Sequence, residues 1–155
     1  MRRPIILDTQ LMVLLVVGMT SIHIIPKHKN LTAFTIDDFE LLSLLIGAEA
    51  ELILLPNTVS EAANLLRQHK NPERTRIMQV FAELINQHEE RYFESALVVK
   101  MKNYLRLGIT DAAILKCCDG QCEILTADVE LYVAAANEGM RVVNFNHKRE
   151  DFGLI

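Results

Sequence analysis

Two kinds of hydrophobic pattern alternate along the chain. Short runs that are hydrophobic at nearly every position lie between longer segments in which hydrophobic residues recur every three or four positions. The short runs predict buried strands, and the periodic segments predict helices. The predicted strands are residues 5–7, 51–55, 122–126 and 140–145. Strands that are hydrophobic on both faces are typical of parallel sheets covered by helices. The alternation therefore predicts an α/β fold, a three-layer α/β/α sandwich with a central, mainly parallel sheet.

Helix-start and helix-stop residues mark the segments between these strands. Thr35 and Asp38 have the spacing of a capping box, and Thr58 is placed to cap the helix after the second strand. A stripe of hydrophobic residues from Leu97 to Leu105 predicts one helix, which Gly108 would end. The other predicted helices cover residues 10–20, 57–70, 110–118 and 128–139, together with one that begins at Asn71-Pro72. With 155 residues and no repeat or linker, the chain predicts a single domain over residues 1–155.

The hydrophobic run Leu11–Met19 raises the question of a membrane segment. It is shorter than the roughly 20 residues that a membrane-spanning helix needs, so a buried helix is expected and no membrane association. Because this helix is hydrophobic on all sides, a dimer or partner surface stays open as an alternative. No small-residue cleavage site follows Arg2 and Arg3, so no secretory signal is expected.

Composition narrows the classes of function only a little. The formal charge of −4 does not indicate a basic nucleic-acid-binding domain. Cys117, Cys118 and Cys122 have no nearby histidine that would complete a zinc site. They are expected to be reduced thiols, which agrees with a cytoplasmic location.

Four acidic residues, far apart in the sequence, occupy related positions next to the predicted strands. Asp8 follows the first strand, Glu61 lies in the helix after the second, Asp111 begins a short helix, and Asp128 begins the helix after the third strand. Strand ends and helix starts share one edge of a parallel sheet, where ligands bind. Any one acid, taken alone, is better explained as a helix cap. Gathered together, they would repel one another unless cations neutralise them, and such oxygen ligands suit Mg²⁺ or Mn²⁺.

Four blocks of the sequence resemble, in order, those of PIN domains, the metal-dependent ribonuclease domains of VapC-type toxins and RNA-processing enzymes. The blocks are "ILDTQ" (6–10), "PNTVSEAANLL" (56–66), "LGITDAAIL" (107–115) and "ILTADVELYVAAANEGMRVVNF" (124–145). The resemblance implies metal ligation by the four acids, with support from Thr126 and Thr9. Glu130 stands where a further Asp is frequent, and Gln10 stands where many members have Asn or Ser.

The resemblance implies a Mg²⁺- or Mn²⁺-dependent endoribonuclease whose products carry a 5′-phosphate and a 3′-hydroxyl. It also implies homodimers and, for toxin members, a cognate antitoxin. Candidate contacts to RNA phosphates are the basic residues Arg67, Lys70, Arg74 and Arg76, with Lys100, Lys102 and Arg106 as further candidates. These residues are equally typical of solvated helix faces. Because basic residues are sparse and Gln10 departs from the family pattern, a non-catalytic PIN-like module that binds a partner or RNA stays open as the alternative.

Overall fold

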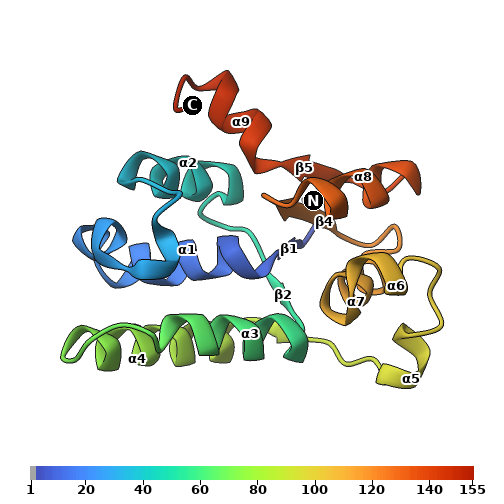
Figure 1. The fold of residues 1–155 in the computed structure, drawn as a ribbon, viewed down its shortest axis with the longest axis horizontal. Coiled ribbons are helices and arrows are strands. Elements are labelled where there is room, and N and C mark those ends of the chain that lie inside the picture. The colour runs from blue at the N-terminus through green and yellow to red at the C-terminus, as the bar shows by residue number, and fades with distance from the viewer. Residues whose placement is uncertain (1–2) are drawn as a thin grey trace.

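In the computed structural model, which describes residues 3–155, short parallel strands alternate with helices (Figure 1). The strands are β1 (Ile5–Leu7), β2 (Ile53–Leu54), β3 (Glu89–Glu90), β4 (Glu123–Thr126) and β5 (Val142–Asn144). The longer helices are α1 (Thr9–Thr20), α2 (Ile36–Ile46), α3 (Pro56–Leu66), α4 (Glu73–Gln87), α7 (Ile109–Cys117) and α8 (Val129–Asn137). Shorter helical pieces are α5 (Ser95–Val98), α6 (Tyr104–Leu107) and α9 (Phe145–Asp151), with 3₁₀ turns at Ile22–Lys27 and Lys29–Leu31.

β1 lies where the order of strands along the chain reverses. β4 pairs with it in parallel, with Ile6 opposite Ile124, and β5 pairs with the far side of β4. On the other side of β1, a single parallel bridge joins Ile5 to Leu52 next to β2, and β2 pairs with β3. The order across the described strands is therefore β3-β2-β1-β4-β5. In open parallel sheets a crevice forms at such a reversal, beyond the carboxyl ends of the strands, and here it falls between β1 and β4.

Strand side chains point alternately into two separate hydrophobic clusters. Ile5 and Leu7 belong to a cluster formed with α1 to α4, whereas Ile6 belongs to a second cluster formed with α5, α7 and α8. Figure 1 shows α1 to α4 on one side of the strands and α5 to α7 on the other. The mixed α/β character predicted from the hydrophobic pattern is confirmed.

α1 is buried inside the molecule on all its faces. Every residue from Leu11 to Gly18 is buried, and the helix contacts α2, α3 and α4. Residues 11–18 therefore offer no surface to a dimer or other partner, because their neighbours in the same chain already cover them. Within residues 3–155, no helix has both the length and the hydrophobicity needed to cross a membrane.

Several predicted local features are confirmed and others need correction. Thr35 and Asp38 form both hydrogen bonds of a capping box at α2. Thr58, in contrast, does not cap α3: the helix begins at Pro56, and the Thr58 hydroxyl donates to the carbonyl of Leu55 (3.0 Å). The helix predicted from Leu97 to Leu105 is interrupted between α5 and α6, and Leu105 is 93% exposed. Its hydrophobic residues therefore do not form one buried stripe.

The cysteine prediction is wrong for two of the three residues. Cys118 and Cys122 form a disulfide, because the turn between α7 and β4 brings their Cα atoms to 5.0 Å. Cys117 is a free, buried thiol.

Candidate active site

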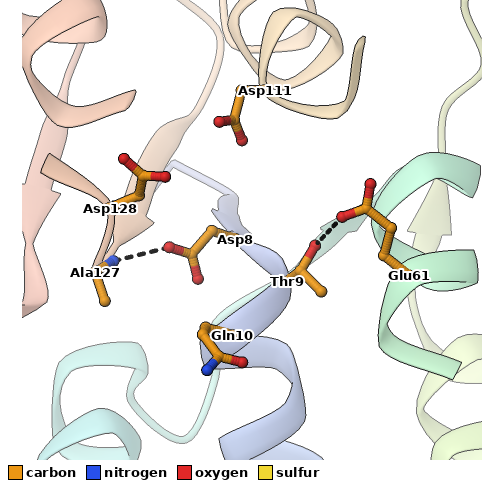
Figure 2. A pocket seen from close by; sticks show the side chains of 7 residues that line it. All are labelled: Asp8, Thr9, Gln10, Glu61, Asp111, Ala127 and Asp128. Atoms are coloured by element: carbon orange, nitrogen blue, oxygen red, sulfur yellow. Dashed lines mark hydrogen bonds between the residues drawn. The ribbon is translucent and has the colours of Figure 1, made fainter. Parts of the chain in front are cut away.

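A pocket of about 400 Å³ opens at the carboxyl end of β1, where the strand order reverses. It is lined by Asp8, Thr9, Gln10, Glu61, Asp111, Ala127 and Asp128. All four acids singled out in the sequence lie here, carried by four different elements (Figure 2). The topology explains why the four acids lie together, since each one follows a strand or lies in the first turns of a helix at this edge of the sheet.

Asp8 is the most deeply placed of the acids, with 6% of its surface exposed. As N-cap of α1, its Oδ1 accepts from the backbone N–H of Leu11 (2.9 Å). Its Oδ2 accepts from the Thr126 hydroxyl (2.5 Å) and from the N–H of Ala127 (2.8 Å). The carboxylate is thus fixed by donors from both α1 and the turn after β4.

Thr126 connects Asp8 to Asp128. While its hydroxyl donates to Asp8, the same oxygen accepts from the N–H of Asp128 (2.9 Å). Asp128 caps α8 with Oδ1, which accepts from the N–H groups of Glu130 (2.8 Å) and Leu131 (3.2 Å). Asp128 therefore caps a helix and lines the pocket at the same time, so the two explanations considered for it are compatible.

Glu61 is held by two hydroxyl groups. Thr9 donates to its Oε1 (3.2 Å) and Thr110 donates to its Oε2. Thr110 was predicted from sequence only as a possible start of a helix, yet α7 begins at Ile109 and carries both Thr110 and Asp111 in its first turn. Its position next to Asp111 in the sequence is the one signal that could have pointed to its contact with Glu61.

Two acids of the pocket, Asp8 and Asp111, have raised pKa values. Desolvation, followed by repulsion from Asp128, Asp8, Glu61 and Glu130, raises the pKa of Asp111 to about 7. Burial also raises the pKa of Asp8, against the lowering effect of its hydrogen bonds. Among the residues that the structure describes, no basic side chain lines the pocket to offset these negative charges.

The remaining predicted residues lie at the edge of the site or away from it. Glu130 is exposed on α8 and does not line the pocket, although its charge contributes to the raised pKa of Asp111. Gln10 lines the pocket, and its Nε2 donates to the carbonyl of Asn30 (3.4 Å).

None of the basic residues proposed for RNA contact lines the acidic pocket. Arg67 and Arg74 line a separate shallow hollow of about 490 Å³ where α3 ends and α4 begins, and Lys70 and Arg76 lie close by in sequence and are exposed. Figure 1 shows that this turn is at the end of the helix pair remote from the start of α3. Among the further candidates, Lys100 is exposed, Lys102 pairs with Glu138 (3.3 Å), and Arg106 donates to Asn103 (3.4 Å).

The chemistry of the acidic pocket fits a hard divalent cation, since its donors are carboxylate oxygens with unbalanced charge. Across residues 3–155, however, no three acidic, histidine or cysteine side chains are already arranged around one ion position. Mutual repulsion favours such a separation, and Thr9 and Thr110 hold the carboxylate of Glu61 in its present position. Binding an ion would therefore require side-chain rotation in the pocket.

No protein-family model, curated protein or solved structure matches this chain. The resemblance to PIN domains stays a prediction from the ordered sequence blocks, and function has to be argued from the pocket.

Proposed function

We propose that this chain is a Mg²⁺- or Mn²⁺-dependent endoribonuclease of the PIN type. The observation that carries the proposal is the meeting of Asp8, Glu61, Asp111 and Asp128 in one pocket with the pKa of Asp111 raised to about 7. A purely structural set of helix caps does not need to share a cavity. Acids that bind the same cation must lie in one cavity.

The fold gives the proposal further support. Strand side chains alternate between two helix-covered clusters, as expected for the three-layer α/β/α sandwich of PIN-like proteins. The acids lie at the carboxyl ends of the strands, where open α/β sheets place their ligands.

The protein's own residues divide the work of the site. Asp8 and Asp128, fixed by Thr126, would provide the rigid half of the ligand set. Glu61 and Asp111 would complete it, Glu61 by leaving its contacts with Thr9 and Thr110, and Asp111 by releasing its proton near neutral pH. When bound, the cation supplies Lewis acidity, which polarises a phosphodiester and lowers the pKa of a water molecule.

RNA cleavage tests this proposal directly. Wild-type protein with Mn²⁺ is expected to cut a 5′-labelled single-stranded RNA into labelled fragments that end in a 3′-hydroxyl, and EDTA is expected to stop the reaction. Asp128→Asn should lower the rate at least about a hundredfold, since loss of a ligand removes several kcal/mol of stabilisation of the transition state. Asp37→Asn, an exposed acid in the first turn of α2, is the matched control. Cleavage that persists in EDTA, or that Asp128→Asn leaves intact, would overturn the proposal.

A second candidate is a non-catalytic PIN-like module that binds RNA or a protein partner. The separation of the acidic pocket from Arg67 and Arg74 favours it, because none of the basic residues within 3–155 lines the pocket to receive a phosphate. It predicts RNA binding without cleavage at any Mn²⁺ concentration. The homodimer, the cognate antitoxin and the cytoplasmic location remain predictions under either function.

A further inference from the structure

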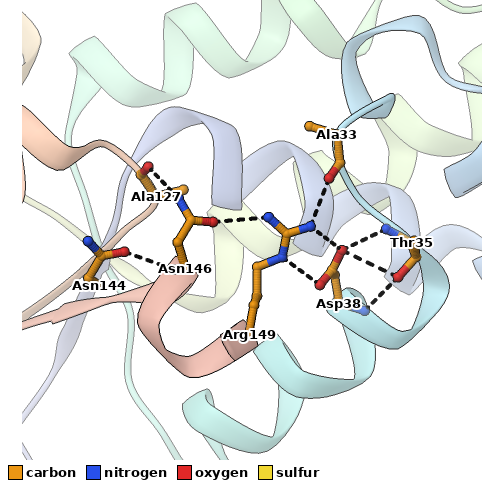
Figure 3. A network of polar contacts seen from close by, with 7 residues as sticks. All are labelled: Ala33, Thr35, Asp38, Ala127, Asn144, Asn146 and Arg149. Carbon is orange, nitrogen blue, oxygen red and sulfur yellow. Dashed lines mark hydrogen bonds and ion pairs between the residues drawn. The ribbon is translucent and has the colours of Figure 1, made fainter. Parts of the chain in front are cut away.

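A chain of polar contacts crosses the molecule from α2 to the turn after β4 (Figure 3). It begins at Asp38, which is 1% exposed in its side chain and pairs with Arg149 of α9 through both oxygens (2.8 and 3.0 Å). The same guanidinium donates to the carbonyl of Ala33 (2.9 Å) and to Oδ1 of Asn146 (3.0 Å). Arg149 therefore links Asn146 to Asp38 in α2 and to the loop before it.

Asn146 in turn contacts a residue that lines the acidic pocket. Its Nδ2 donates to the carbonyl of Ala127 (3.2 Å), the residue between Thr126 and Asp128. The backbone N–H of Asn146 is itself held by Oδ1 of Asn144 (2.9 Å), and Asn144 lies opposite Thr126 in the parallel register of β5 and β4. The start of α9 is thus placed beside the turn that carries Asp128.

The peptide unit between Ala127 and Asp128 is held at both ends. Asn146 binds its carbonyl, and the Thr126 hydroxyl binds its N–H group. The preceding N–H, that of Ala127, donates to Asp8. The orientation of this peptide therefore sets where the Asp128 side chain begins, and the peptide before it carries one of the two backbone donors to Asp8.

We propose that Asn146, fixed by Arg149, is a positioning residue for the metal-ligating pair Asp8 and Asp128. This inference rests on the proposed function and deepens it. Outer-shell groups that orient ligands typically change metal affinity or activity by about 10- to 100-fold when they are removed. Asn146 is outside the pocket lining, so it acts through the Ala127–Asp128 peptide and not by contact with substrate.

A simple structural role would give a different result. If Asn146 served only to attach α9, its loss would lower the melting temperature and leave the folded protein fully active. If it positions the site, the folded protein should bind Mn²⁺ more weakly and turn over more slowly, with the KM for RNA little changed.

The test uses Asn146→Leu, which keeps the size and branching of the side chain but cannot form hydrogen bonds. Asn86→Leu, at an exposed position of α4, is the matched control, and Arg149→Lys removes the fork that holds Asp38 and Asn146 together. For each full-length variant, Mn²⁺ affinity is measured by calorimetry, kcat and KM by RNA cleavage, and amide hydrogen exchange of Ala127 and Asp128 by NMR. Asn146→Leu is expected to weaken Mn²⁺ binding and lower kcat about tenfold and to accelerate exchange at both amides, with a smaller effect for Arg149→Lys.

The outcomes separate this inference from the proposed function. Wild-type protein that binds Mn²⁺ and cuts RNA, with Asn146→Leu indistinguishable from Asn86→Leu, would overturn the positioning role and leave the proposed function intact. Wild-type protein that neither binds Mn²⁺ nor cuts RNA would overturn both the proposed function and the positioning of metal ligands. In that case faster exchange at Ala127 and Asp128 would show that Asn146 orders this turn for another reason.

Discussion

The carboxylate of Asp8 accepts three hydrogen bonds, whereas Asp128 uses one oxygen to cap α8 and leaves the other facing the pocket. This difference matters for choosing variants. Sequence considerations alone treat the two acids as equivalent ligands, but they differ in how well asparagine replaces them. Asparagine at position 128 keeps the capping bond, since Asn is as good an N-cap as Asp. Asparagine at position 8 would put an NH₂ group where Oδ2 accepts from Thr126 and Ala127.

Truncation to alanine should reveal the same difference in stability. Asp8→Ala removes the cap of α1 and leaves the N–H of Leu11, the N–H of Ala127 and the Thr126 hydroxyl without their acceptor. We expect a loss of about 2–3 kcal/mol in the free energy of unfolding, against about 1 kcal/mol for Asp128→Ala. Urea denaturation at pH 7 without metal measures both. Equal losses would show that the buried hydrogen bonds of Asp8 contribute little.

Asp111 should make the metal-free protein less stable as the pH rises. Its pKa is raised from 3.8 to about 7 on folding, so between these values the folded state holds a proton that the unfolded state releases. Stability from this group is therefore present at pH 4 and lost as the pH passes 7.

Asp111→Asn cannot ionise, so it is expected to be more stable than wild type at pH 8 and to match wild type near pH 4. Because solvent screens a half-buried group, the expected gain at pH 8 is only about 1–2 kcal/mol. Denaturant melts at the two pH values, with Asp119→Asn in the exposed turn as control, measure this. A variant that is no more stable at pH 8 would mean that neither burial nor repulsion by the neighbouring acids disfavours the ionised form of Asp111.

At the residue scale, the sequence could identify the acids, and the resemblance to PIN domains also named Thr126 and Thr9, which contact Asp8 and Glu61, but it could not identify every group that holds them. An acid after a strand or at a helix start has a recognisable position, so Asp8, Glu61, Asp111 and Asp128 could be selected. The hydroxyl of Thr110 and the amide of Asn146 could not, because their roles depend on which side chains approach after the chain has folded. Neither has a spacing that distinguishes it from an ordinary polar residue.

The packing of helix α1 against helix α2 depends on one small residue, Gly18. Gly18 is buried in α1, and a Cβ atom added there would collide with the ring of Phe39 in α2. Gly18→Ala should therefore destabilise the fold by about 1–3 kcal/mol, although alanine favours helices. Thermal melting of Gly18→Ala and of the double variant with Phe39→Leu checks the cause. If the smaller side chain at position 39 restores none of the lost stability, the collision is not the reason.

At the element scale, prediction succeeded where burial alone decides the pattern. The strands β1 and β4 were recognised because their hydrophobic residues are buried in the core. The strand β5 and the helix α8 were recognised although only part of their hydrophobic surface is buried. β3 consists of two glutamates and pairs only with β2, so no hydrophobic signal marks it. The region from Leu97 to Leu105 failed for the opposite reason: its hydrophobic residues are there, but part of them face solvent.

On the scale of the whole molecule, the topology brings together groups that are as far apart in sequence as Asp8 and Asp128. Reversal of the strand order at β1 creates the crevice, and α9 folds back over its edge through Asn146 and Arg149. The number of crossovers between strands and the contact with α9 could not be predicted from local patterns, because both depend on packing between distant segments.

The measurement that tests the central claim most directly is a calorimetric titration of Mn²⁺ into the chelator-treated, full-length protein at pH 8, paired with thermal melting. We predict saturable binding, with a gain of about 2.7 kcal/mol in stability when free Mn²⁺ reaches about 100 times Kd. In Asp128→Asn the affinity should fall at least about tenfold, while Asp37→Asn should bind like wild type. Absence of both binding and stabilisation, or equal binding by Asp128→Asn, would contradict the claim that these acids share a divalent cation.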